Sequence, residues 1–335
     1  MDFKVIVTIS ENLVSNPEKL RSIDSLGSCI YRLNGAHCEP DSLTVMIKNL
    51  KDVLKDPKII LDLPGNKVRT KGLSEPIYLG KGEIFDLHDY FVNYPKFYSH
   101  LESGDFILTN DSNFILEVKE IKNTTVRLVP HSDGFLHNNK GLHARGVYDF
   151  LPFIFEKDMD LINIACENDI DYLSLSYVRT AQDIKEIKNI LLKNNNRHIQ
   201  LFAKIETLTA VKNLESILKG VDHICVDRGD LSADIGILNL PAAQDYILNI
   251  AKKANKNVYL ATQFLKNMEH HPVPLIAEIS DLHKTIKLGI NGIQLSEETA
   301  VGKYPVECAK IVFDMLNQCF PNKDEKLQEE NLIPS

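Results

Sequence analysis

Residues 199–230 read IQLFAKIETLTAVKNLESILKGVDHICVDRGD, which contains two short apolar runs that each end in charged residues. The first run, Ile199–Lys204, leads into Glu206, and the second, His223–Val226, leads into an Asp-Arg-Gly-Asp sequence. Short runs rich in Ile, Val and Leu are typical of buried strands in a parallel sheet. Because side chains alternate along a strand, Lys204 and Glu206 are expected on one face. The stretch therefore predicts two strands whose ends carry charge.

Runs of the same kind recur along the chain. Eight are predicted as strands: Val5–Thr8, Cys29–Leu33, Lys58–Leu61, Tyr172–Ser176, Ile199–Lys204, His223–Val226, Val258–Ala261 and Gly292–Leu295. Amphipathic helical patterns lie between most of them, for example at Thr180–Lys193, Pro241–Lys253 and Pro305–Leu316. This alternation predicts an α/β fold, and eight strand–helix units predict a (β/α)8 TIM barrel over residues 1–70 and 149–320.

The alternation stops in residues 71–148, where the sequence is punctuated by turn signals. Phe106–Thr109, Phe114–Val118 and Thr125–Val129 have the pattern of strands. We predict a small β domain inserted between strand 3 and helix 3. Active sites of TIM barrels lie at the carboxyl ends of the strands, so such an insertion would form a lid. Residues 321–335 are predicted to be a polar tail.

Composition argues against several classes of protein. The chain has 335 residues, 44% apolar residues and a formal net charge of −8. No Lys/Arg-rich run favours nucleic acid, and no apolar stretch approaches the ~20 residues of a membrane span. The six scattered cysteines indicate free thiols in a reducing compartment, and the first residues lack a signal peptide's apolar stretch. We predict a cytoplasmic protein with small-molecule substrates, and neither nucleic-acid nor membrane partners.

The residues at the predicted strand ends combine positive charge with carboxylates. The cations are Arg32, Lys67, Arg69 and Lys204, while Glu206 and Asp230 follow neighbouring strands. Two carboxylates with substrate oxygens and water are typical of Mg²⁺ (or Mn²⁺) sites. Phosphoryl transfer needs this mixture of charges, because its catalysis is mostly positioning and neutralisation of oxygen charge. The alternative is that these charges are solvated or form ion pairs with one another.

At these positions the chain resembles the pyruvate kinase family, along nearly all of its length to about residue 316. The matching segments are Tyr31-Arg32-Leu33-Asn34, Leu61-Asp62 with Gly65, Val68-Arg69-Thr70, Glu156-Lys157-Asp158, Lys204-Ile205-Glu206, Arg228-Gly229-Asp230-Leu231, Ala261-Thr262-Gln263 and Ser296-Glu297-Glu298-Thr299-Ala300. Each segment is short, but their order and spacing together form a specific signal. The resemblance implies a phosphotransferase that transfers the phosphoryl group of phosphoenolpyruvate to ADP, giving pyruvate and ATP.

The resemblance also implies roles for single residues. The implied metal ligands are Glu206 and Asp230, and the implied catalytic residues are Lys204, Arg32, Thr262 and Arg69. Lys204 would stabilise the transferring phosphoryl group and the enolate. The implied substrate-binding residues are Gly229, Asp230, Arg228, Asn34 and Ser296, with the backbone N–H groups near Gly229 receiving the substrate carboxylate. His37, Lys140 and Asp111 would lie on the nucleotide side.

Some positions depart from the family. Its potassium site uses Asn, Ser and Asp, but here Asn34 and Asp62 accompany Ala36. Lys67 stands where potassium-dependent members carry Glu, and its ammonium group can supply the positive charge that K⁺ otherwise brings. We therefore expect catalysis that does not require K⁺. The alternative is that Lys67 points to solvent.

Other departures affect the substrate side. Asp227 replaces the small residue expected before Arg-Gly-Asp, and Pro64 replaces a basic one. If Asp227 pointed inward, it would repel an anionic substrate or recruit a second cation; in the barrel wall it would have no such effect. Ile276 replaces an arginine near the family's subunit interface. The sequence leaves open whether the chain forms a homodimer through the barrel.

Three alternatives to ADP phosphorylation follow. The chain could be a relative that handles phosphoenolpyruvate or pyruvate with another acceptor or substrate, or a metal-enolate aldolase or lyase of the same barrel superfamily. It could also be a catalytically silent binding protein. The family's C-terminal regulatory domain has no counterpart in these residues, so we expect an enzyme without that allosteric control. The sequence leaves open the direction of flux and the pathway.

Overall fold

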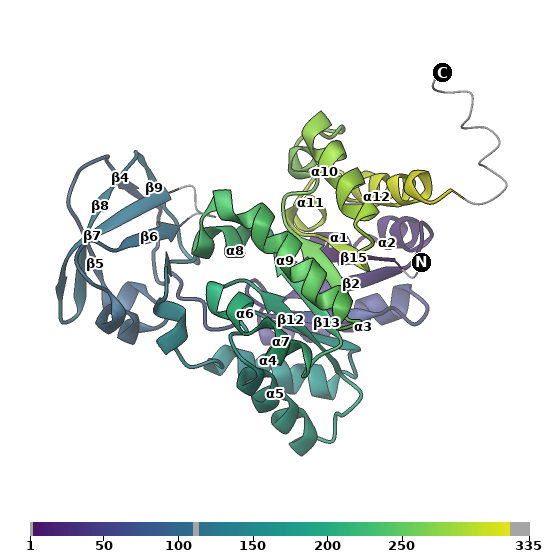
Figure 1. Ribbon diagram of the computed structural model, residues 1–335, viewed down its shortest axis with the longest axis horizontal. Helices are drawn as coiled ribbons and strands as arrows, with labels where there is room; N and C mark the ends of the chain where they lie inside the picture. Colours follow the sequence, from purple (N-terminus) through teal and green to yellow (C-terminus); the bar gives the residue numbers. More distant parts are fainter. Residues whose placement is uncertain (1–2, 110–113, 322–335) are drawn as a thin grey trace.

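Eight parallel strands form a closed barrel in the computed structural model, which describes residues 3–109 and 114–321 (Figure 1). The barrel strands are β1 (Lys4–Ile9), β2 (Cys29–Asn34), β3 (Ile59–Leu63), β11 (Tyr172–Leu175), β12 (Gln200–Ile205), β13 (His223–Asp227), β14 (Asn257–Ala261) and β15 (Gly292–Leu295). Strand β1 pairs with both β2 and β15, which closes the barrel. The predicted TIM barrel is confirmed, and each predicted strand coincides with an observed one.

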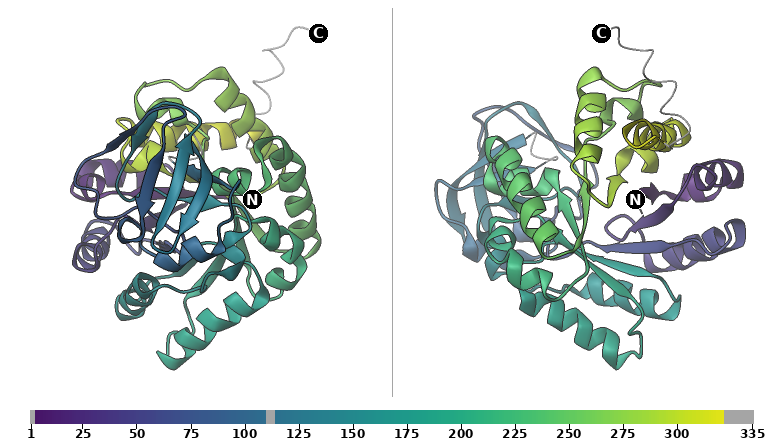
Figure 2. Two further views of the ribbon diagram at one scale, coloured as in Figure 1. Left: turned by 90° about the vertical axis from the view of Figure 1, so that its left-hand side faces the viewer. Right: turned by 45° about the vertical axis from the view of Figure 1, so that its right-hand side comes forward.

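Helices surround the barrel and cover its outer face (Figure 2). They are α1 (Glu11–Val14), α2 (Pro17–Asp24), α3 (Pro40–Val53), α4 (Glu156–Glu167), α5 (Ala181–Lys193), α6 (Leu208–Lys212), α7 (Leu214–Leu218), α8 (Arg228–Ile235), α9 (Leu240–Lys253), α10 (Ile276–Lys287), α11 (Glu297–Ala300) and α12 (Pro305–Cys319). The hydroxyl of Thr180 caps α5 by accepting a hydrogen bond from the Gln182 N–H at 3.2 Å. The apolar face of α5 is buried against the barrel, as its 3.6-residue period predicts.

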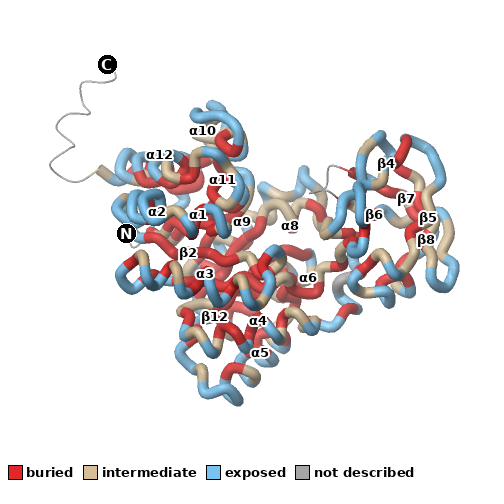
Figure 3. The backbone as a smooth tube through the Cα atoms, turned by 180° about the vertical axis from the view of Figure 1, so that it is seen from behind, coloured by how far each residue is buried: buried red, intermediate tan, exposed pale blue. Residues whose placement is uncertain are grey.

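The barrel strands are buried along most of their length (Figure 3), which explains their nearly continuous apolar runs. The barrel interior is filled by a cluster that includes Ile6, Ile30, Ile60, Phe202, Cys225 and Tyr259. Because side chains alternate along a strand, the residues two positions further on also face the interior, at the carboxyl end. Those residues are Thr8, Arg32, Asp62, Lys204, Asp227 and Ala261. The period of the strands therefore places five polar side chains, together with Ala261, at one end of the barrel.

Two antiparallel sheets lie between β3 and α4 in the sequence, and they form a separate body beside α8 (Figures 1 and 2). The larger sheet has the order β10-β6-β7-β8-β5, and the smaller pairs β4 with β9. These strands are β4 (Ile77–Leu79), β5 (Phe85–His88), β6 (Phe106–Thr109), β7 (Phe114–Lys122), β8 (Thr125–Pro130), β9 (Gly134–Leu136) and β10 (His143–Ala144). The three strands predicted here coincide with β6, β7 and β8. The domain boundaries at 71 and 148 stay a prediction.

This inserted part has its own apolar core and contacts the barrel through α8. His143 Nε2 lies 3.3 Å from Asp234 Oδ1, and the Arg145 side chain donates a hydrogen bond to the Ala233 carbonyl oxygen at 3.1 Å. No helix in the described parts of the chain is both long enough and apolar enough to cross a membrane. Of the predicted tail, only Pro321 belongs to the described residues.

Candidate active site at the carboxyl ends of the barrel strands

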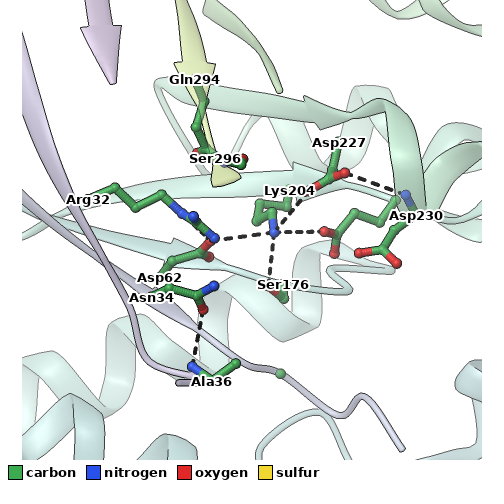
Figure 4. Close-up of polar contacts among 12 residues, drawn as sticks. Arg32, Asn34, Ala36, Asp62, Ser176, Lys204, Asp227, Asp230, Gln294 and Ser296 are labelled. Atoms are coloured by element: carbon green, nitrogen blue, oxygen red, sulfur yellow. Dashed lines mark hydrogen bonds and ion pairs between the residues drawn. The ribbon is translucent and has the colours of Figure 1, made fainter. Parts of the chain in front are cut away.

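Lys204 lies at the centre of the polar side chains at this end of the barrel (Figure 4). Its Nζ is 2.8 Å from Glu206 Oε1, 3.3 Å from Asp227 Oδ2 and 3.5 Å from Asp62 Oδ2. The side chain is almost completely buried. Burial lowers the pKa of Lys204, but the surrounding carboxylates of Asp62, Glu206 and Asp227 raise it well above its usual value. The ammonium group is therefore held charged in the interior.

Arg32 and Asp62 form the second ion pair of the site. Arg32 Nε donates a hydrogen bond to Asp62 Oδ2 at 2.7 Å, and its Nη1 donates to the hydroxyl of Thr8 at 2.9 Å. Burial would raise the pKa of Asp62, but the charges of Lys204 and Arg32 outweigh it and lower that pKa. Both cations are thus oriented by carboxylates before any substrate arrives.

Three carboxylates at this end of the barrel fit a divalent cation. Glu206, Asp227 and Asp230 each offer one oxygen, and these oxygens lie within 4.8 Å of one another. Burial, followed by the charges of Asp230 and Asp227, raises the pKa of Glu206, although Lys204 opposes this. Hard oxygen donors of this kind suit Mg²⁺ or Mn²⁺. Asp227 therefore lies beside the two carboxylates that the sequence singled out as ligands.

The first turn of α8 brings backbone N–H groups to the same place. Asp227 is the N-cap residue, and its Oδ1 accepts a hydrogen bond from the Asp230 N–H at 3.4 Å. The Gly229 N–H donates to Thr262 Oγ1 at 2.9 Å. Thr262 has a φ of +74°, which a β-branched residue rarely adopts. This strained turn after β14 holds the Thr262 hydroxyl against the start of α8.

Comparison with known proteins decides the family. Residues 2–309 match the family described as "Pyruvate kinase, barrel domain". The chain belongs to the pyruvate kinase family. It is 32% identical to plastidial pyruvate kinase 3 of Arabidopsis thaliana over 92% of this chain and 56% of that protein. It is 29% identical to a pyruvate kinase of Borreliella burgdorferi over 98% of this chain and 71% of the relative. For a pyruvate kinase of Thermotoga maritima, the identity is 32% over 92% of this chain and 69% of the relative.

Lys67 does not contact the residues with which it was grouped as a substitute for K⁺. Its Nζ is 2.6 Å from Asp230 Oδ1, whereas Asp62 binds Arg32 and Lys204. The side-chain oxygen of Asn34 accepts a hydrogen bond from the Ala36 N–H at 3.1 Å. The segment that follows β3 leads from Asp62 to the start of α8, where Lys67 lies. The ion pair with Asp230 shows that the alternative in which Lys67 points to solvent is wrong, while its role as a substitute for K⁺ with Asn34 and Asp62 stays a prediction.

Arg228, which the pyruvate kinase motif implies as a substrate-binding residue, contacts α10 and the segment after β14. Its Nη1 lies 2.7 Å from Asp281 Oδ2, and its Nη2 donates to the Thr262 carbonyl oxygen at 2.6 Å. The guanidinium group stacks over Phe264 at 4.0 Å from the ring centroid. These contacts fasten α8 to the segment after β14 and to α10. The substrate-binding role of Arg228 stays a prediction.

Two of the residues predicted for the nucleotide side, His37 and Lys140, lie near Arg69, between the barrel and the insertion. Arg69 Nη1 donates to the Asn139 carbonyl oxygen at 3.2 Å, next to Lys140. Burial, followed by the positive charges of Arg69 and Arg32, lowers the pKa of His37, and Lys140 contributes in the same direction. His37, Arg69 and Lys140 therefore share one neighbourhood. Asp111 lies outside the described residues.

Ser296 closes the opposite side of the site, at the end of β15. It is buried, and its backbone N–H donates to Glu298 Oε2 at 2.8 Å. Two contacts of the site were missed from the sequence. Ser176 Oγ accepts a hydrogen bond from Lys204 Nζ at 3.3 Å, and the Tyr177 N–H donates to Glu206 Oε2 at 2.6 Å. Their signal was the predicted end of strand four at Ser176, beside the strand that carries Lys204.

Proposed function

We propose that this chain transfers the phosphoryl group of phosphoenolpyruvate to ADP, giving pyruvate and ATP. The observation that supports this most is the position of the Lys204 ammonium group, between the Arg32–Asp62 ion pair and the carboxylates of Glu206 and Asp230. Membership of the pyruvate kinase family supports the same reaction. The chain spans just over half the length of the first of these relatives. The activity of the full-length relatives is therefore a proposal for this chain.

Glu206 and Asp230 are the proposed ligands of Mg²⁺ or Mn²⁺. Both carboxylates lie at the same end of the barrel, with oxygens inside the 4.8 Å cluster. When bound, the cation would supply Lewis-acid charge neutralisation at the phosphate and carboxylate oxygens of the substrate. Glu206 is buried and Asp230 is partly buried in the barrel mouth. Electrostatic interactions with a bound cation are stronger there than in water.

Lys204 and Arg32 are proposed to stabilise the charge that moves during transfer. The bond between phosphorus and the enol oxygen breaks, and a bond forms between phosphorus and a terminal oxygen of ADP. Arg32 binds the phosphoryl oxygens, and Lys204 stabilises both this group and the enolate oxygen left behind. Because each cation is already fixed by carboxylates, little reorganisation is needed at the moment of reaction.

Thr262 and the first turn of α8 are proposed to hold the other end of the substrate. The N–H groups of Gly229 and Asp230 point from a helix N-terminus, where an anion is favoured. The enolate carbon takes up a proton on the face beside the Thr262 hydroxyl to give pyruvate. Asn34 and Ser296 complete the substrate side, while Arg69, His37 and Lys140 are proposed to contact the nucleotide.

The test is pyruvate release from phosphoenolpyruvate and ADP with Mg²⁺, measured with K⁺ and with tetramethylammonium. Equal turnover with both monovalent cations supports the reaction and the expected independence from K⁺. Turnover with K⁺ alone keeps the reaction and removes that independence. No pyruvate from folded protein that binds Mg²⁺ and oxalate would contradict the proposed acceptor.

A different phosphoryl acceptor is the second candidate. Asp227 points into the site, so this departure from the family is at the proposed substrate-binding position. Screening small alcohols and acids in place of ADP would detect such an acceptor by pyruvate release.

A cytoplasmic location and a homodimer through the barrel are proposed alongside the activity. Ile276 and Leu238 are exposed apolar residues on the helical side of the barrel that a second copy could cover.

A further inference from the structure

Asp227 lies where β13 passes into α8, and both of its carboxylate oxygens face the candidate active site. Oδ1 accepts a hydrogen bond from the Asp230 N–H at 3.4 Å, and Oδ2 is 3.3 Å from Lys204 Nζ. The side chain is buried, and Figure 4 shows it between Lys204 and the start of α8. It is two residues beyond Cys225, which belongs to the cluster inside the barrel, so the strand period fixes its inward direction.

The contacts of Asp227 use two groups that an anionic substrate would need. A helix N-terminus attracts an anion through its unpaired N–H groups, and here the chain's own carboxylate occupies one of them. The Gly229 N–H is likewise engaged by the Thr262 hydroxyl. Asp227 also faces Lys204, the cation nearest the proposed site of phosphoryl transfer. A substrate carboxylate entering this position meets an intramolecular competitor of the same charge.

The charges around Lys204 make the competition stronger. Three cations, Arg32, Lys67 and Lys204, already form ion pairs with Asp62, Asp230 and Glu206 respectively. Asp227 adds a fourth carboxylate to these three matched pairs. Like charges at such separations repel strongly where water is largely excluded. Among these seven residues, the carboxylates therefore outnumber the cations by one.

We propose that Asp227 is a specificity-determining residue that competes with the substrate carboxylate for the N-terminus of α8 and for Lys204. It lowers the affinity of the site for a substrate that carries a carboxylate beside its reacting oxygen. A small uncharged residue at this position would free Lys204 and remove the like charge from the N-terminus of α8. The inference rests on the proposed function, because it takes the substrate carboxylate to bind at α8.

The experiment is calorimetric titration of oxalate in the presence of saturating Mg²⁺, with wild type, Asp227→Ser and Asp227→Asn. Ser and Asn both cap helices well, so α8 keeps its cap while the charge is lost. We expect oxalate to bind Asp227→Ser at least tenfold more tightly than wild type. Asp227→Asn should show a smaller gain, because its amide still fills the space. The control Asp222→Asn, which removes an exposed carboxylate that binds Lys256 outside the site, should leave oxalate affinity unchanged.

Unchanged or weaker oxalate binding in both Asp227 variants overturns the proposal. If Mg²⁺ alone also binds more weakly to them, Asp227 acts as a metal ligand instead. Thermal unfolding of each variant reports whether the fold is kept, and the Asn variant serves if the Ser variant is unstable. Tighter oxalate binding in a protein that makes no pyruvate supports the inference and contradicts the proposed function. Pyruvate production by wild type without the gain in the variants contradicts the inference alone.

Discussion

Lys67 and Asp230 meet across the mouth of the barrel, with Lys67 Nζ 2.6 Å from Asp230 Oδ1. Lys67 belongs to the segment after β3, and Asp230 belongs to the first turn of α8. Despite burial, the charges of Lys67 and Lys204 hold the pKa of Asp230 well below its usual range. This ion pair places a fixed cation beside a proposed metal ligand.

Lys67→Glu is expected to make catalysis depend on K⁺. The new carboxylate would face Asp230, as a like charge, in place of a cation. Turnover in tetramethylammonium should fall at least tenfold, and K⁺ should restore part of it. The measurement is the rate of pyruvate release in both salts. Lys67→Arg keeps the charge and should behave like wild type, and a Glu variant indifferent to K⁺ would show that Lys67 does not replace the ion.

Lys204→Met is expected to abolish turnover while Mg²⁺ and oxalate still bind. The substitution removes the ammonium group from Glu206, Asp227 and Asp62 and keeps an unbranched apolar stem. Unpaired buried carboxylates should lower the melting temperature, and Mg²⁺ should raise it more in the variant than in wild type. Steady-state kinetics and thermal unfolding with and without Mg²⁺ test both effects. Near-normal turnover in this variant would falsify the proposed role of Lys204.

The strand period accounts for what the sequence predicted of the site. Phe202, Lys204 and Glu206 share one face, and Phe202 fills the barrel interior, so the direction of the two charged residues follows from the strand alone. The same rule applied from Cys225 would have placed Asp227 inside. The predicted strand ends at Val226, one residue before the observed end, and does not include Asp227.

The contact partners of residues on connecting segments could not be predicted from the two-residue period of the strands. Lys67 and Arg228 lie beyond the strand ends, where the path of the chain depends on contacts with distant elements. Arg228 is held by Asp281 of α10 and by Phe264, which offer it a carboxylate and an aromatic face. A motif locates such a residue in the fold, while its direction follows from tertiary packing.

Glu206→Gln is expected to weaken the binding of Mn²⁺ in the absence of substrate. Glu206 is fully buried and is one of three carboxylates with oxygens inside the 4.8 Å cluster. Loss of a partner outside the ligand set already costs about 10–100-fold in metal affinity, so loss of a ligand charge should cost at least as much. Titration of Mn²⁺ by electron paramagnetic resonance measures this. Asp222→Asn, an exposed carboxylate outside the cluster, is the matched control, and equal losses in the two variants would argue against a ligand role.

Asp158 ties the segment that carries Lys67 to α4. Its Oδ1 accepts a hydrogen bond from the Gly65 N–H at 2.9 Å, and its Oδ2 accepts one from the Phe155 N–H at 2.9 Å. Burial raises the pKa of Asp158 from 3.8 to about 6, although these hydrogen bonds oppose the shift. The folded protein therefore binds a proton at Asp158 more readily than the unfolded chain does.

The contribution of Asp158 to stability should rise as the pH falls from about 6 to about 4, since the folded state takes up its proton first. A shift of about two pKa units corresponds to roughly 3 kcal/mol as an upper limit. The difference in unfolding free energy between wild type and Asp158→Asn should thus grow in favour of wild type between pH 7 and pH 4, as measured by urea denaturation. Asp222→Asn gives the opposite sign, because the hydrogen bond from Lys256 lowers the pKa of Asp222 and that contribution is lost as the pH falls. A difference for Asp158→Asn that is constant with pH, or that shrinks toward pH 4, would show that its carboxylate stays charged in the folded protein.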